Sequence, residues 1–172
     1  LTGNHLDLYP EPLRPTIDAL NARIYPAVNN GVYRAGFATT QGAYEAAFDE
    51  VFNELEYLEA LLSRQRYLAG EYLTEADVRL FTTLVRFDAV YHGHFKCNLR
   101  RLTDYPNLSN WLRELYQWPG VAQTVNMEHI QKHYYMSHKR INPNGIVPKG
   151  PLRDFGLTHD RERLVGKGIW QA

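Results

Sequence analysis

The sequence predicts an all-α protein, a bundle of amphipathic and buried helices. Apolar residues recur at three- and four-residue steps between residues 43 and 64, which is the spacing of one face of a helix. Residues 76–87 are apolar almost all round, as expected for a central buried helix. Pro- and Gly-rich stretches separate these runs, and we find no convincing βαβ unit.

The first predicted helix runs from about Leu13 to Asn29. Pro26 removes a backbone donor and crowds the preceding turn, so the helix should kink or break there. The sequence Asn29-Asn30-Gly31 predicts a left-handed stop. The following stretch, Val32 to Gln41, has no helical period and is predicted to be an irregular connection.

The clearest pattern predicts an amphipathic helix from about Ala43 to Arg64. Its apolar stripe comprises Tyr44, Ala47, Phe48, Val51, Phe52, Leu55, Leu58 and Leu62. Its acidic residues lie mostly on the opposite side and are interpreted as a solvated face: Glu45, Asp49, Glu50, Glu54, Glu56 and Glu59.

A turn at residues 70–73 leads into the predicted buried helix. Thr74 as N-cap and Asp77 three residues later resemble a capping box, with Asp in place of the usual Glu. The helix should end near Tyr91, with Gly93 as its stop.

Two further helices complete the predicted bundle. One is short, is preceded by Pro106 and is closed by Trp118-Pro119-Gly120, and the last runs from about Thr124 to Lys139. After Ile141 the chain is rich in Pro and Gly and should run extended over the surface. We therefore expect a helical domain at residues 1–151 and a tail at residues 152–172.

Composition excludes several classes of function. Nineteen basic and nineteen acidic side chains cancel, so no nucleic-acid partner is indicated. No apolar run is long enough to span a bilayer, and no membrane partner is expected. The single cysteine, Cys97, excludes an internal disulfide and favours a reducing, cytoplasmic setting.

Several motifs resemble the C-terminal domain of the glutathione transferases. The turn and capped helix at residues 67–78, and residues 105–121 around Trp111, are typical of the superfamily. Three sharper segments resemble the glutathionyl-hydroquinone reductases, the xi class: residues 29–38, residues 93–98, and residues 133–151. Together the resemblance covers about Asn4 to Pro151.

The resemblance implies a two-domain enzyme of which this chain is the helical, substrate-side half. In that family a thioredoxin-like N-terminal domain, absent from this chain, binds glutathione as co-substrate and carries the nucleophilic cysteine. The thiolate attacks the glutathione sulfur of a glutathionyl-hydroquinone, and a second glutathione regenerates the enzyme. A homodimer is implied, and we expect this chain alone to be inactive.

The resemblance assigns catalytic roles to three tyrosines. Tyr33 matches the proton donor and acceptor of the family. Tyr91 and Tyr134 match tyrosines that hydrogen-bond near the cysteine sulfur and so lower its pKa. Without the resemblance, the simplest interpretation of each ring is structural packing. The three side chains lie far apart in sequence, so their convergence is a prediction.

Other residues are weaker candidates. His129 and His133 are spaced to present two imidazoles on one helix face, and His92 with His94 invites the same idea, but we expect no metal site because further ligands are not evident. Cys97 is interpreted as structural because no paired base is evident. Arg34, beside Tyr33, could steer a carboxylate, although a surface role is simpler.

Two alternatives stay open. Helical domains of this type also serve as non-catalytic protein-interaction modules, in which the tyrosines would be dispensable. A glutathione transferase of another class, with conjugating activity, is the third possibility.

Overall fold

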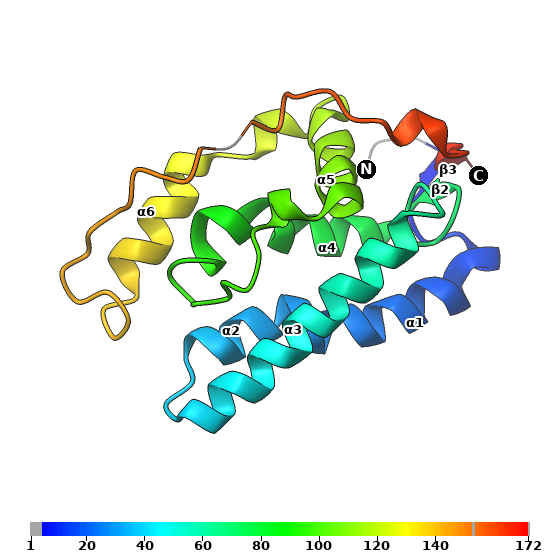
Figure 1. The fold of residues 1–172 in the computed structure, drawn as a ribbon. Helices are drawn as coiled ribbons and strands as arrows, with labels where there is room; N and C mark the ends of the chain where they lie inside the picture. The colour runs from blue at the N-terminus through cyan, green and yellow to red at the C-terminus, as the bar shows by residue number, and fades with distance from the viewer. Residues whose placement is uncertain (1–4, 153, 172) are drawn as a thin grey trace.

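The computed structural model describes residues 5–152 and 154–171. Residues 1–4, Arg153 and Ala172 lie outside the described residues, and the last two belong to the predicted tail. Six α-helices dominate the described chain (Figure 1). Their bounds are Arg14–Ile24 (α1), Gly31–Gly36 (α2), Gln41–Leu62 (α3), Glu75–Arg86 (α4), Pro106–Gln117 (α5) and Met127–Ser137 (α6). The all-α prediction is confirmed, with the addition of a small sheet.

That sheet joins segments from the two ends and the middle of the chain. Its strands are Leu6–Asp7 (β1), Tyr72–Leu73 (β2) and Gly168–Gln171 (β3), in the order β1-β3-β2. β3 pairs antiparallel with β1 and parallel with β2. The sequence pattern did not reveal it, because strands of two to four residues are too short to show a period of two.

The left-handed stop predicted after the first helix is wrong. A π-helical turn, Tyr25–Asn29, follows α1 at Pro26 and leads directly into α2. Asn30 has φ −91°, a right-handed conformation rather than the predicted left-handed stop. The segment expected to be irregular therefore begins as a helix. Glycines at both ends of α2 hid it from the pattern, since glycine is a poor helix former.

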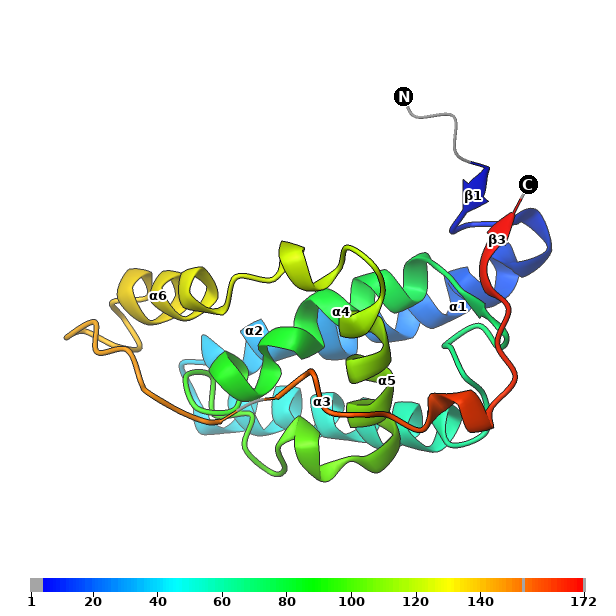
Figure 2. The same ribbon diagram turned by 90° about the horizontal axis from the view of Figure 1, so that it is seen from above.

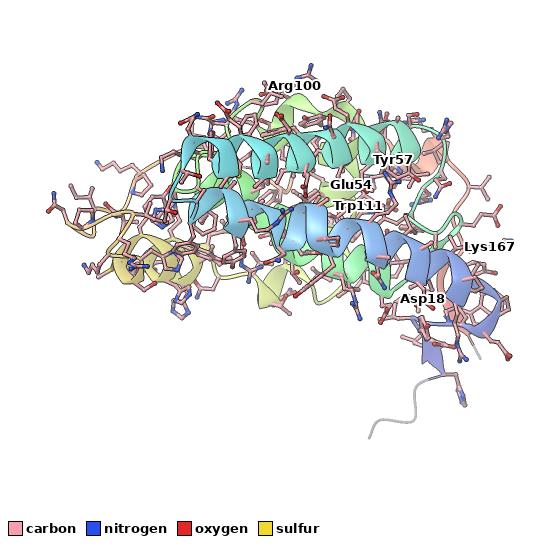
Figure 3. The ribbon with its side chains drawn as sticks, turned by 90° about the horizontal axis from the view of Figure 1, so that it is seen from below. Asp18, Glu54, Tyr57, Arg100, Trp111 and Lys167 are labelled. Atoms are coloured by element: carbon pink, nitrogen blue, oxygen red, sulfur yellow. The ribbon has the colours of Figure 1, made fainter. Side chains whose placement is uncertain are left out.

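The α3 helix packs against both α2 and α5. Seen from below, α3 and α1 lie side by side, with Glu54 and Tyr57 between them (Figure 3). Glu54 is buried and accepts from Arg23 at 2.9 and 3.2 Å, so it does not belong to a solvated face as predicted. Glu59 accepts the backbone N–H groups of Asn107 and Leu108 and so caps the start of α5.

The capping box at the start of α4 is present as predicted. Asp77 is fully buried and accepts four hydrogen bonds, from the Leu68 amide, the Thr74 amide and hydroxyl, and the Trp111 indole, at 2.9–3.1 Å. These bonds tie the turn before α4 and the α5 helix to one carboxylate. A second π-helical turn, Phe87–Tyr91, extends α4 to the predicted end, but Lys96 rather than Gly93 takes the left-handed conformation, with φ 60°.

The last helix is shorter than predicted, because α6 begins at Met127, capped by Asn126, and ends at Ser137. From there the chain returns across the bundle to β3 (Figure 2). Arg161, fully buried on this return, donates to the carbonyls of Leu62, Gln65 and Arg66 at 2.6–2.7 Å and so caps the end of α3. None of the described helices combines the length and apolarity that a bilayer crossing requires.

Candidate active site

Three tyrosine hydroxyls from separate segments meet at the α6 end of the bundle. Tyr33 lies on α2, Tyr91 is the last residue of the π-helical turn after α4, and Tyr134 lies on α6. The hydroxyls of Tyr91 and Tyr134 are 2.8 Å apart, and those of Tyr33 and Tyr134 are in close hydrogen-bond contact. The structure thus brings together the three tyrosines that the resemblance singled out, with Tyr134 in the middle.

The three hydroxyls differ in burial. Tyr91 and Tyr134 are buried, with 2% and 6% of their surface exposed, whereas Tyr33 is only partly buried. Burial, reinforced by the hydrogen bond to Tyr33, raises the pKa of Tyr134 to about 12. Burial also raises the pKa of Tyr91, as does its hydrogen bond to Tyr134. Both hydroxyls therefore stay protonated at neutral pH and can donate hydrogen bonds.

A count of protons shows what this cluster can do. Each hydroxyl carries one proton, and the two bonds that join Tyr33, Tyr134 and Tyr91 use two of the three. One proton is left to donate outside the cluster. Either oxygen of each pair can be the donor; when Tyr91 donates to Tyr134 and Tyr134 to Tyr33, the free proton lies on Tyr33, the least buried member. Hydrogen bonds in such a chain polarise one another, which strengthens the terminal donor.

Aromatic rings surround the hydroxyl cluster. Phe95, fully buried, lies 5.2 Å from the Tyr33 ring, 5.4 Å from Tyr91 and 6.0 Å from Tyr134, measured between centroids. His138, just after α6, lies near-parallel to Phe95 at 5.8 Å and edge-on to Tyr134 at 5.4 Å. Its Nδ1 is 3.1 Å from Nε2 of the buried His94. Sequence reasoning missed Phe95 and His138, since a ring's neighbours are not visible in a pattern.

The remaining candidates lie outside the hydroxyl cluster, although the His133 ring is edge-on to the Tyr134 ring at 5.3 Å. Cys97 is fully buried, and burial raises the pKa of its thiol to about 12, which makes it a poor nucleophile. Arg34 forms an ion pair with Glu50 on the surface. His129 and His133 are exposed on α6. Across the part of the chain that is described, no three His, Cys, Asp or Glu side chains gather closely enough to hold a metal ion.

Comparison with known proteins identifies the family. The family described as "Glutathione S-transferase, C-terminal domain" matches residues 41–114. The glutathionyl-hydroquinone reductase PcpF of Sphingobium chlorophenolicum is 58% identical over 153 residues, which are 88% of this chain and 49% of that protein. The reductase YqjG of Escherichia coli is 56% identical over 160 residues, 93% of this chain and 49% of that protein.

Solved structures agree. The glutathione-bound structure of YqjG matches 91% of this chain and 51% of its own with a TM-score of 0.90. A xi-class glutathione transferase from Natrialba magadii, 51% identical, matches 94% of this chain and 51% of its own with a TM-score of 0.92. This chain contains a glutathione S-transferase C-terminal domain, and it is called the xi-class domain below because it is similar to the xi-class enzymes. The xi-class domain spans about half the length of the curated relatives it matches.

The family match covers much of the core but only part of the candidate site. Residues 41–114 contain the α4 capping box and Asp77 but only one of the three tyrosines, Tyr91. Tyr33 and Tyr134 lie on either side of this segment. The xi-class domain therefore combines a core that the superfamily model describes with a hydroxyl cluster that it only partly includes.

Proposed function

We propose that the xi-class domain is the substrate-side half of a glutathione-dependent oxidoreductase that reduces glutathionyl-hydroquinones to hydroquinones. The observation that carries the proposal is the convergence of three hydroxyls, with one proton left to donate. The names of the relatives and the glutathione bound to YqjG support the same substrate class. Glutathione is the co-substrate, and a thioredoxin-like domain joined to this chain carries the nucleophilic cysteine.

The reaction proceeds in two balanced steps. The thiolate of that cysteine attacks the glutathione sulfur, an S–S bond forms, and the carbon–sulfur bond to the ring breaks. The ring carbon keeps the electron pair and takes one proton, so that hydroquinone leaves. A second glutathione thiolate then attacks the mixed disulfide, releasing glutathione disulfide and restoring the cysteine.

The tyrosines supply the proton and polarise the sulfur. Tyr33 donates the proton to the ring carbon, because its hydroxyl is the accessible end of the cluster. Tyr134 and Tyr91 stabilise the tyrosinate that forms by hydrogen bonding to it directly and through the chain. The one donor that the cluster has free also lowers the pKa of the cysteine when it points at the sulfur, since a donor favours the thiolate, and Tyr134 and Tyr91 contribute by polarising it.

The domain cannot perform this chemistry by itself. Its one thiol, Cys97, is buried and has a pKa of about 12, so it does not replace the missing nucleophile. We therefore expect no turnover from these 172 residues alone. The proposal also includes a homodimer and a cytoplasmic location, where glutathione is abundant and reduced.

The test replaces Tyr33 by Phe in the full-length protein. Loss of the proton donor should lower kcat for release of hydroquinone by about 10²-fold or more, while the melting temperature stays within a few degrees. Tyr25→Phe is the matched control, because Tyr25 precedes α2 by a few residues and is 60% exposed. Unchanged turnover in Tyr33→Phe would remove the proton-donor role and favour a non-catalytic interaction module. Conjugation without thiolysis would instead indicate a transferase of another class.

A further inference from the structure

Gly36, the last residue of α2, presses directly on the Phe95 ring. A Cβ atom added at Gly36 would lie 2.3 Å from Cγ and Cδ1 of Phe95 and 2.8 Å from its Cβ. Contacts this short do not occur between real side chains, so any other residue at this position forces the helix or the ring to move. Gly36 does not have a positive φ, so this position needs glycine for space rather than for conformation.

Phe95 has little room to retreat. Its ring is fully buried, and the rings of His138 and His94 lie 5.8 and 5.3 Å from it. It also contacts the rings of all three tyrosines. A residue larger than glycine at position 36 must therefore lift α2 away from Phe95 or push Phe95 into the cluster.

The other end of α2 is fixed by a second glycine. A Cβ at Gly31 would lie 3.0 Å from Cγ2 of Val51 on α3 and 3.4 Å from the Pro26 carbonyl oxygen. The short helix is thus held close to α3 at one end and to Phe95 at the other. Tyr33 lies between the two contacts, so the approach of α2 at both ends sets where its hydroxyl meets Tyr134.

We propose that Gly36 and Phe95 are positioning residues that hold the Tyr33 hydroxyl in the donating geometry. The inference rests on the proposed function of Tyr33 as proton donor. Hydrogen bonds weaken steeply when distance or angle is lost, and proton transfer needs the reacting atoms within hydrogen-bond reach. A shift of α2 by about 1 Å is enough to cost on the order of 10²-fold in rate.

The experiment compares Gly36→Ala with Gly42→Ala in the full-length protein. Both glycines are helical, but a Cβ at Gly42 meets nothing within 4 Å. We expect Gly36→Ala to lower kcat about 10–100-fold with a small change in KM, and Gly42→Ala to leave both unchanged. Equal kcat values for Gly36→Ala and wild type would overturn the proposal.

A double-mutant cycle shows whether Gly36 acts through Tyr33. If it does, Gly36→Ala in a Tyr33→Phe background should cost less than twofold more, because the group that it positions is already gone. Independent losses that multiply would overturn the proposal. If Gly36→Ala does not fold, Phe95→Leu takes its place in the same cycle, with the same two outcomes.

A second readout separates this inference from the proposed function. Carbon-13 at the tyrosine Cζ reports hydrogen bonding of the hydroxyl by NMR, and Tyr33→Phe assigns its signal. We expect Gly36→Ala, but not Gly42→Ala, to shift the Tyr33 signal. If the Tyr33 signal shifts in Gly36→Ala but Tyr33→Phe keeps full activity, the proposed function alone is wrong. If the Tyr33 signal does not move in Gly36→Ala, the positioning role is wrong.

Discussion

Two buried polar centres in this domain contrast in how completely their hydrogen bonds are satisfied. At the start of α4, the Asp77 carboxylate accepts four bonds from three segments, and its role is to hold the core together. At the far end of the same helix and its extension, three tyrosine hydroxyls share two bonds and keep one proton to donate. We call the Asp77 centre closed, because its carboxylate is fully hydrogen-bonded, and it stabilises the fold. We call the tyrosine centre open, because one donor is free for chemistry.

The largest effect is expected at the closed centre. Asp77→Ala removes the acceptor of several buried donors at once, and each unsatisfied donor costs about 1–3 kcal/mol. The free energy of unfolding in urea should therefore fall by at least about 3 kcal/mol. Asp49→Ala, at an exposed position of α3, is the control and should change it by less than about 0.5 kcal/mol. A small loss in Asp77→Ala would show that the centre does not carry the core.

A smaller loss of stability is expected at the open centre. Tyr134→Phe removes the middle hydroxyl, breaks both bonds and leaves the buried Tyr91 hydroxyl without its partner. We expect a cost of about 1–2 kcal/mol in urea unfolding, together with a clear loss of turnover. Tyr57→Phe keeps the ring that contacts Arg23 and should be neutral in both assays. A loss as large as that of Asp77→Ala would erase the contrast between the two centres.

The third effect is absent at neutral pH and concerns the edge of the tyrosine cluster. Burial, and to a lesser degree the charge of His138, lowers the pKa of His94 to about 4. The unfolded chain therefore binds the proton first, so the contribution of His94 is complete above pH 6.5 and is lost as the pH falls toward 4.

In that range His94 should add a slope of up to about 1.4 kcal/mol per pH unit to the free energy of unfolding. His94→Gln should flatten the slope, whereas the exposed His129→Gln should not. Identical slopes in His94→Gln and wild type would show that protonation of His94 does not couple to folding.

How much the sequence could predict also differs between the two centres. The capping box and the buried α4 helix follow from local spacing, because Thr74 and Asp77 act within one turn. The tyrosine cluster joins residues up to 101 positions apart, and only a resemblance to known enzymes suggested it. Local pattern placed Tyr33 in an irregular segment, because the two glycines that seat α2 against its neighbours also hide it as a helix.

The small sheet and the Arg161 cap were invisible for a related reason. Arg161 lies in a polar stretch that predicts a surface residue. Its guanidinium nevertheless donates to three carbonyls at and just after the end of α3. These hydrogen bonds depend on the path that the chain takes across the bundle after α6 (Figure 2). Contacts between segments that are far apart in the sequence leave no signal in composition or periodicity.

The central claim is that this domain supplies protons and a substrate wall while the nucleophile lies elsewhere. The most direct test is to treat the full-length protein with a glutathionyl-hydroquinone, quench it before the second glutathione reacts, and map the mixed disulfide by peptide mass spectrometry. We expect glutathione on a cysteine outside these 172 residues, with the Cys97 peptide unmodified. Glutathione on Cys97, accompanied by release of hydroquinone from the isolated domain, would contradict it.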